Sequence, residues 1–128
     1  LKLCPVPSQP VPILIGGHSK LALKRAAKLG DGWISAGITL EETKDFINQI
    51  NTYREEFGTL DHPNYQFQVM GEAAYSPDGV KALEDLGATE VIVAFRNAYE
   101  GGPDERTLDS IKAEISWYAE EVINKFRT

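Results

Sequence analysis

The chain has 128 residues, a hydrophobic fraction of 42% and a formal net charge of -6 at pH 7, which fits one ordinary domain with a single core. Acidic and basic residues are interspersed and no cluster of positive charge is visible, so we expect no nucleic-acid partner. Cys4 is the sole cysteine and there are two histidines, too few for a disulfide framework or a Cys/His zinc site.

No apolar run approaches the roughly 20 residues that a membrane helix needs, and the first residues lack the basic and apolar regions of a signal peptide. We therefore expect a protein of the reducing cytoplasm with no membrane partner. The sequence opens at Leu1 and its first methionine is Met70. We expect this N-terminus to be a cut rather than a natural beginning.

Residues 1 to 12 contain four prolines, which predict an extended lead-in before a single domain over residues 13 to 128. Residues 13 to 15 form a short apolar run, closed by Gly16 and Gly17. Such a run is typical of a strand buried on both faces. The first strand is therefore expected to end at the glycine pair.

A first helix follows, with Ser19 as its N-cap and Gly30 as a left-handed C-terminal stop. Its apolar residues are spaced to lie on one face: Ala22, Ala26 and Leu29. After the turn at residues 31 and 32, residues 33 to 36 predict a second short strand that leaves the sheet at Gly37.

Thr39 and Glu42 form a capping box at the start of a second helix, which Gly58 ends. Its apolar face recurs at helical spacing through Phe46, Ile50, Tyr53 and Phe57. Residues 65 to 73 alternate loosely between apolar and polar types and predict a third strand.

A third helix is expected from Ser76 and Pro77 to Gly87, with an inward face formed by Val80, Leu83 and Leu86. Residues 90 to 95 predict the fourth strand. A loop at residues 101 to 103 leads to a final helix that aligns Leu108, Ile111, Ile115 and Val122.

Four strands and four helices therefore alternate along the chain. Each crossover helix returns the chain to start the next strand in the same direction, so the strands are parallel and the fold class is α/β. A complete (β/α)8 TIM barrel takes about 250 residues. Four consecutive βα units in 128 residues predict half of such a barrel.

The residues that follow the carboxyl ends of parallel strands face the ligand, and here these are residues 16–19, 35–37, 72–74 and 96–97. In the first stretch, two glycines let backbone N–H groups approach a ligand, and the helix at Ser19 directs its positive end to the same place. The residues alone favour equally a phosphate site and a simple tight turn.

His18 has neither a second local metal ligand nor the partners of a catalytic triad, so we expect it to donate to a ligand or lie on the surface. We expect Trp33 to pack in the core, and Glu72 and Arg96, if they face each other, to be a solvated pair. Solvated helix faces are expected for Glu41, Glu42, Glu55, Glu56, Glu120 and Glu121. No catalytic residue is identified.

Four segments, in this order, resemble the luciferase-like flavin and deazaflavin oxidoreductases, the family of bacterial luciferase-like monooxygenases. They are residues 12–19 (PILIGGHS), 23–27 (LKRAA), 30–33 (GDGW) and 83–95 (LEDLGATEVIVAF). The resemblance runs over nearly the whole chain.

The resemblance implies a (β/α)8 barrel that binds FMN or the deazaflavin coenzyme F-420 and transfers hydride or activates oxygen. It implies that Gly16, Gly17, His18 and Ser19 lie near the cofactor phosphate. The GDGW form is more similar to the deazaflavin-dependent branch. The family's N-terminal strands, which supply much of the isoalloxazine pocket and the substrate contacts, are absent from this sequence.

We therefore interpret the chain as the C-terminal half of such an oxidoreductase, acting on a small organic substrate and inactive alone. The alternative is a non-catalytic α/β module that binds a phosphorylated ligand or a partner subunit. A half-barrel has two unpaired strand edges, so we expect a homodimer or association with a missing N-terminal half. A stable monomer would favour an open, flavodoxin-like sheet.

Overall fold

The computed structural model describes residues 4, 6–96 and 102–126. Its strands are β1 (Leu14–Gly16), β2 (Gly32–Ile34), β3 (Gln66–Met70) and β4 (Glu90–Ile92). The helices are α1 (Lys20–Leu29), α2 (Leu40–Phe57), α3 (Pro77–Asp85), α4 (Leu108–Tyr118) and α5 (Asn124–Phe126), with a 3-10 turn η1 (Glu72–Tyr75) and a π-helical turn η2 (Ala119–Ile123). The predicted alternation of strands and helices is confirmed.

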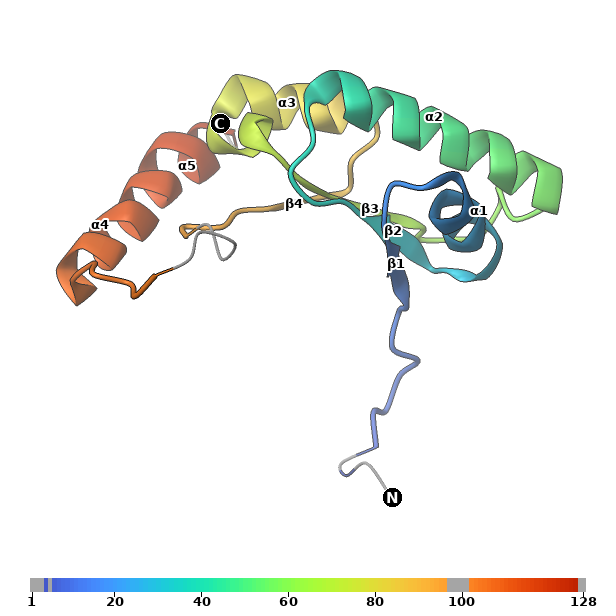
Figure 1. The fold of residues 1–128 in the computed structure, drawn as a ribbon, viewed down its shortest axis with the longest axis horizontal. Coiled ribbons are helices and arrows are strands. Elements are labelled where there is room, and N and C mark those ends of the chain that lie inside the picture. Colours follow the sequence, from blue (N-terminus) through green and yellow to red (C-terminus); the bar gives the residue numbers. More distant parts are fainter. Residues whose placement is uncertain (1–3, 5, 97–101, 127–128) are drawn as a thin grey trace.

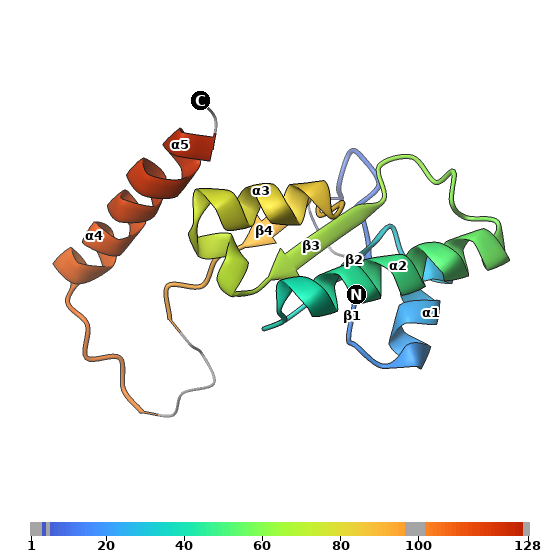
Figure 2. The same cartoon turned by 90° about the horizontal axis from the view of Figure 1, so that it is seen from above.

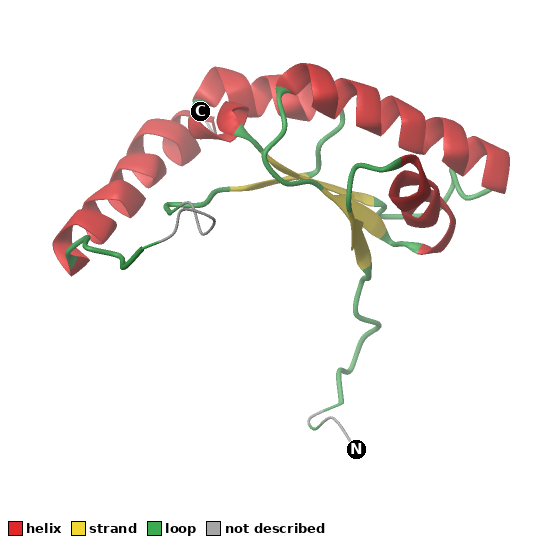
Figure 3. Cartoon of the chain, in the orientation of Figure 1, coloured by secondary structure: helices red, strands yellow, loops and turns green. Residues whose placement is uncertain are grey.

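The four strands form one parallel sheet in the order β1-β2-β3-β4. Because right-handed crossovers between sequential strands return every helix to the same side, α1, α2 and α3 all lie over one face of the sheet (Figures 1 and 3). A flavodoxin-like sheet requires the strand order to reverse so that both faces are covered. The observed order is that of half of a TIM barrel.

The strand register assigns the side chains to the two faces of the sheet. Ile15, Trp33 and Phe67 pair across β1, β2 and β3, and they belong to or pack against the buried core. The neighbouring row on the opposite face includes Gln68 and Glu90, whose side chains are joined by a hydrogen bond of 2.6 Å from Nε2 to Oε2. The uncovered face of the sheet is therefore partly polar.

One charged side chain, Arg54 of α2, is buried beneath the loop that leads to β3. Its guanidinium lies 3.9 Å from the ring centroid of Tyr65 and donates to the carbonyls of Thr59 and Leu60. Desolvation lowers the pKa of Arg54 and raises that of Tyr65 to about 12. The cation–π contact between Arg54 and Tyr65 thus holds the loop between α2 and β3 in place.

The prediction that Gly30 ends the first helix in a left-handed conformation is wrong. The φ of Gly30 is -92° and its backbone is extended. A Cβ atom at this position would lie 2.9 Å from the Gly32 carbonyl oxygen and 3.0 Å from that of Ala26. Glycine is required there for close backbone approach rather than for a positive φ. Leu29 also departs from its expected face and is 69% exposed.

The third unit differs from prediction in a local way. Strand β3 stops at Met70, and the 3-10 turn η1 occupies residues expected to extend the strand. Within that turn, the Tyr75 hydroxyl donates to the Ala94 carbonyl (2.7 Å) and accepts from the Ala94 N–H (3.0 Å). The Tyr75 side chain therefore satisfies both the N–H and the carbonyl of Ala94. Strand β4 itself ends at Ile92, earlier than the predicted end at residue 95.

The final helix lies beyond β4, off the end of the sheet (Figures 1 and 2). Val122 is buried as its spacing predicts, but Leu108 and Ile115 are 66% and 50% exposed, so the expected alignment fails. The π-helical turn η2 changes the helical phase within the helix. Much of the apolar surface of α4 has no partner in the part of the chain that the structure describes.

Gly32→Ala tests the close approach of β2 and β3. A Cβ atom there would lie 2.5 Å from the Gln66 carbonyl oxygen, and we expect a loss of about 2–3 kcal/mol in the free energy of unfolding. The control is Gly58→Ala, at φ +67° with open surroundings, which we expect to cost about 1 kcal/mol. Urea unfolding followed by tryptophan fluorescence measures both, and equal losses would contradict the packing argument.

Candidate functional site

The parallel strands bring the expected ligand-facing stretches to one edge of the sheet. Residues 16–19, 35–37 and 72–74 lie at or just after the carboxyl ends of β1, β2 and β3, which pair in register. Arg96 follows β4 at the same edge, while Asn97 lies outside the described residues. The topology thus creates the edge at which sequence predicted the chemistry.

The turn from β1 to α1 is built around Gly17, whose φ of +109° favours glycine. A Cβ atom on Gly17 would lie 3.0 Å from the Cβ of Ala22, a tight contact that adds to the backbone preference for glycine. The Gly17 carbonyl oxygen accepts a hydrogen bond of 2.9 Å from Nε1 of Trp33. Trp33 is fully buried, which confirms its predicted packing and adds a polar contact that the sequence did not reveal.

Ser19 caps α1, since its Oγ accepts from the Ala22 N–H at 3.3 Å. Accepting this bond leaves the hydroxyl hydrogen free to donate, so capping and anion binding are compatible. The first turn of α1 contains no acidic residue and begins with the exposed Lys20. Lys20 was not singled out from sequence, although its place directly after the cap is visible there.

His18 connects the first two loops. Its ring stacks on Phe46 of α2, with centroids 5.1 Å apart, and its Nε2 lies 3.4 Å from the Ala36 N–H. If Nε2 accepts this long bond, the ring hydrogen of a neutral imidazole is on Nδ1. His18 is exposed, which is compatible with both expected roles, a ligand donor and a surface residue.

The second stretch is attached to the end of strand β3. The Ser35 N–H donates to the Gln68 carbonyl and the Ser35 Oγ accepts from the Met70 N–H, at 2.9 and 3.0 Å. A hollow of about 520 Å³ lies between the two loops and is lined by residues 37–40, Glu72 and Ala73. This hollow meets the ligand-facing edge.

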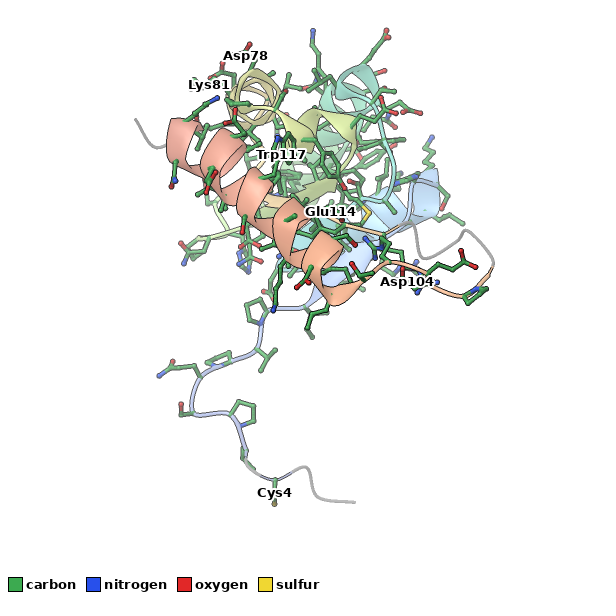
Figure 4. All side chains as sticks on the ribbon, turned by 90° about the vertical axis from the view of Figure 1, so that its left-hand side faces the viewer. Cys4, Asp78, Lys81, Asp104, Glu114 and Trp117 are labelled. Atoms are coloured by element: carbon green, nitrogen blue, oxygen red, sulfur yellow. The ribbon has the colours of Figure 1, made fainter. Side chains whose placement is uncertain are left out.

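Arg96 contacts Asp104, with 3.7 Å between Nη1 and Oδ2, and not Glu72, which the sequence offered as a possible solvated partner. Arg106 donates to Asp104 and to Glu114 of α4, and also to the Phe95 carbonyl. Figure 4 shows Asp104 on the loop that enters α4 and Glu114 on that helix. Hydrogen bonds from Arg106 lower the pKa of Asp104 to about 2.

No group of three or more His, Cys, Asp or Glu side chains suited to a metal ion occurs among the described residues. In the same ranges, no helix is long and apolar enough to cross a membrane. The six acidic helix residues expected on solvated faces are all exposed, as predicted: Glu41, Glu42, Glu55, Glu56, Glu120 and Glu121.

Comparison with known proteins places this geometry in a family. The model of the luciferase-like monooxygenases matches residues 1–120. The chain belongs to the luciferase-like monooxygenase family. Within it, the chain is 41% identical over 124 residues to the uncharacterized protein Rv0940c of Mycobacterium tuberculosis and to the uncharacterized protein Mb0965c of Mycobacterium bovis.

Those alignments cover 97% of this chain but 42% of each relative. This luciferase-like chain thus spans about two fifths of the length of the curated relatives it matches. The match extends through all four strands and the ligand-facing turn at Gly16 to Ser19. The family resemblance and the half-barrel topology are therefore both confirmed.

Arg106→Gln tests the charge network after β4. We expect the pKa of Asp104 to rise from about 2 toward 3.8, because the main donors to its carboxylate are removed. The lowered pKa means that the contact stabilises the fold above about pH 4 and that this contribution is lost as the pH falls toward 2. Carboxyl NMR titration measures the shift, with the exposed Arg25→Gln as control; titration of Asp104 near 3.8 in the unaltered protein would contradict the network.

Proposed function

We propose that this chain is the carboxyl-terminal part of an oxidoreductase that uses FMN or coenzyme F-420, and that the turn from β1 to α1 holds the cofactor phosphate. The observation that carries the proposal is Gly17, which has a positive φ and a tight contact with Ala22 at the ligand-facing edge of a luciferase-like fold. The cofactor supplies the hydride transfer or oxygen activation. The protein binds and orients it.

The residues of the turn fit a phosphate. The first amides of α1 have no partner within the helix, and the helix dipole makes this end positive. Ser19 retains its hydroxyl hydrogen for donation, and Lys20 adds a cation beside it. The first turn of α1 contains no acidic residue that would repel an anion.

The preference for one cofactor over the other comes from a sequence motif. The GDGW sequence at residues 30–33 favours the deazaflavin coenzyme F-420 over FMN. Trp33 within it is fully buried, so its indole has no exposed face on which a cofactor ring could stack. The exposed free thiol of Cys4 is consistent with a cytoplasmic location, which we also propose.

We further propose that catalysis on a small organic substrate requires the rest of a longer protein, and that this chain alone is inactive. The chain covers 42% of its curated relatives, and one face of its sheet is bare (Figure 3). The partly polar row at Gln68 and Glu90 lies on that face. A complete barrel would cover it and close the pocket around the cofactor ring.

Titration with FMN and with coenzyme F-420 tests the phosphate site. Ser19→Asp preserves a favourable N-cap and places a negative charge at the anion site, so we expect at least a tenfold loss of affinity with no loss of stability. Gly17→Val should abolish binding, and inorganic phosphate should compete. Isothermal titration calorimetry measures affinity, and urea unfolding measures stability.

Ser76→Asp is the matched control, because Ser76 caps α3 in the same manner through the Gly79 N–H. We expect Ser76→Asp to bind like the unaltered protein. Equal affinity of the Ser19→Asp variant and the unaltered protein would contradict the phosphate site. Absence of binding to either cofactor would mean that the chain keeps the fold and lacks the site.

The second candidate function is a non-catalytic module that binds a phosphorylated ligand or a partner subunit. It is favoured by the same turn together with the incomplete barrel. Turnover with added cofactor that appears only when the chain is restored to full length would support the oxidoreductase. Phosphate binding without turnover in the full-length protein would support the module.

The exposed apolar surface predicts association. Strands β1 and β4 have free edges in the described sheet, and Leu108, Ile115 and Trp117 of α4 are each about half or more exposed. We propose that a second copy or the missing N-terminal half covers them. Light scattering should show a dimer at high concentration, and a stable monomer would contradict self-association.

A further inference from the structure

The chain has two tryptophans, and one of them makes a contact that packing alone does not require. The Nε1 of Trp33 donates to the Gly17 carbonyl across a sequence separation of 16 residues, at 2.9 Å. Trp33 is fully buried on the helix-covered side of the sheet. Its side chain therefore reaches from the core to the backbone of the exposed turn.

This hydrogen bond determines where the next amide points. In a trans peptide the carbonyl and the following N–H are directed oppositely. Since the Gly17 carbonyl points toward the buried indole, the His18 N–H points away from it. The positive φ of Gly17 makes this orientation accessible without strain.

We propose that Trp33 is a positioning residue for the cofactor phosphate, because its indole N–H holds the Gly17 carbonyl and thereby directs the His18 N–H toward the anion. The inference rests on the proposed phosphate site. It adds the His18 amide to the donors at the start of α1, and it gives the Trp33 indole a role beyond filling the core. Trp33 touches the turn and not the ligand, so it is not a catalytic residue.

Trp33→Phe tests the inference, since phenylalanine keeps an aromatic ring in the core and removes the N–H donor. We expect this variant to remain folded by circular dichroism and to bind inorganic phosphate and FMN about three- to tenfold more weakly. The control is Trp117→Phe, at the half-exposed tryptophan of α4 (Figure 4). We expect its affinity to be unchanged.

A measurement without ligand separates the role of Trp33 from the existence of the site. In ¹⁵N NMR relaxation, the His18 amide of the unaltered chain should be rigid, and in Trp33→Phe its order parameter should fall. The Trp33 indole N–H should also exchange with deuterium far more slowly than that of Trp117. A merely packed Trp33 would show neither difference.

The outcomes distinguish the two proposals. Weaker binding and a mobile His18 amide in Trp33→Phe support the positioning role. Unaltered affinity together with a rigid His18 amide overturns it. Failure of the unaltered chain to bind phosphate, with a mobile His18 amide in the variant, contradicts the phosphate site while supporting the control of the turn by Trp33. If Trp33→Phe does not fold, slow indole exchange of Trp33 in the unaltered chain supports the hydrogen bond and fast exchange overturns it.

Discussion

The handedness of the β-α-β crossover is the constraint on which the rest of this structure depends. Four strands joined in sequential order by right-handed crossovers must carry their helices on one face. The sheet therefore has a covered side that forms the core and a bare side that ends in two free edges (Figure 1). Because the strands are all parallel, every strand-to-helix loop lies at a single edge, which is where a ligand can be bound.

Core and candidate site are linked by one residue of β2. Trp33 is buried beneath α1 and α2, yet its indole bonds to the turn that precedes α1. Packing energy thus holds a polar group in place at the boundary between the interior and the ligand-facing edge. This arrangement explains how a short turn, with little surface of its own to bury, retains a defined backbone conformation.

Sequence reasoning succeeded where the determining interactions are local. The capping box of Thr39 and Glu42 is formed as predicted, with hydrogen bonds in both directions, because its partners are three residues apart. Sequence reasoning failed where the tertiary surroundings determine the conformation or the exposure of a residue. Gly30 is extended because neighbouring carbonyls approach it, and Leu29 is exposed because no element covers that end of α1 in the described chain.

The sequence by itself determined the order of elements, the α/β class, the family and the glycine turn at the end of the first strand. These features depend on periodicity, helix caps and motifs, whose residues lie close together in the sequence. Only the tertiary structure decided that Trp33 bonds to Gly17 and that Arg96 lies near Asp104 instead of Glu72. Such contacts join residues that are distant in sequence or belong to irregular loops. They depend on strand register and loop path, which no local pattern specifies.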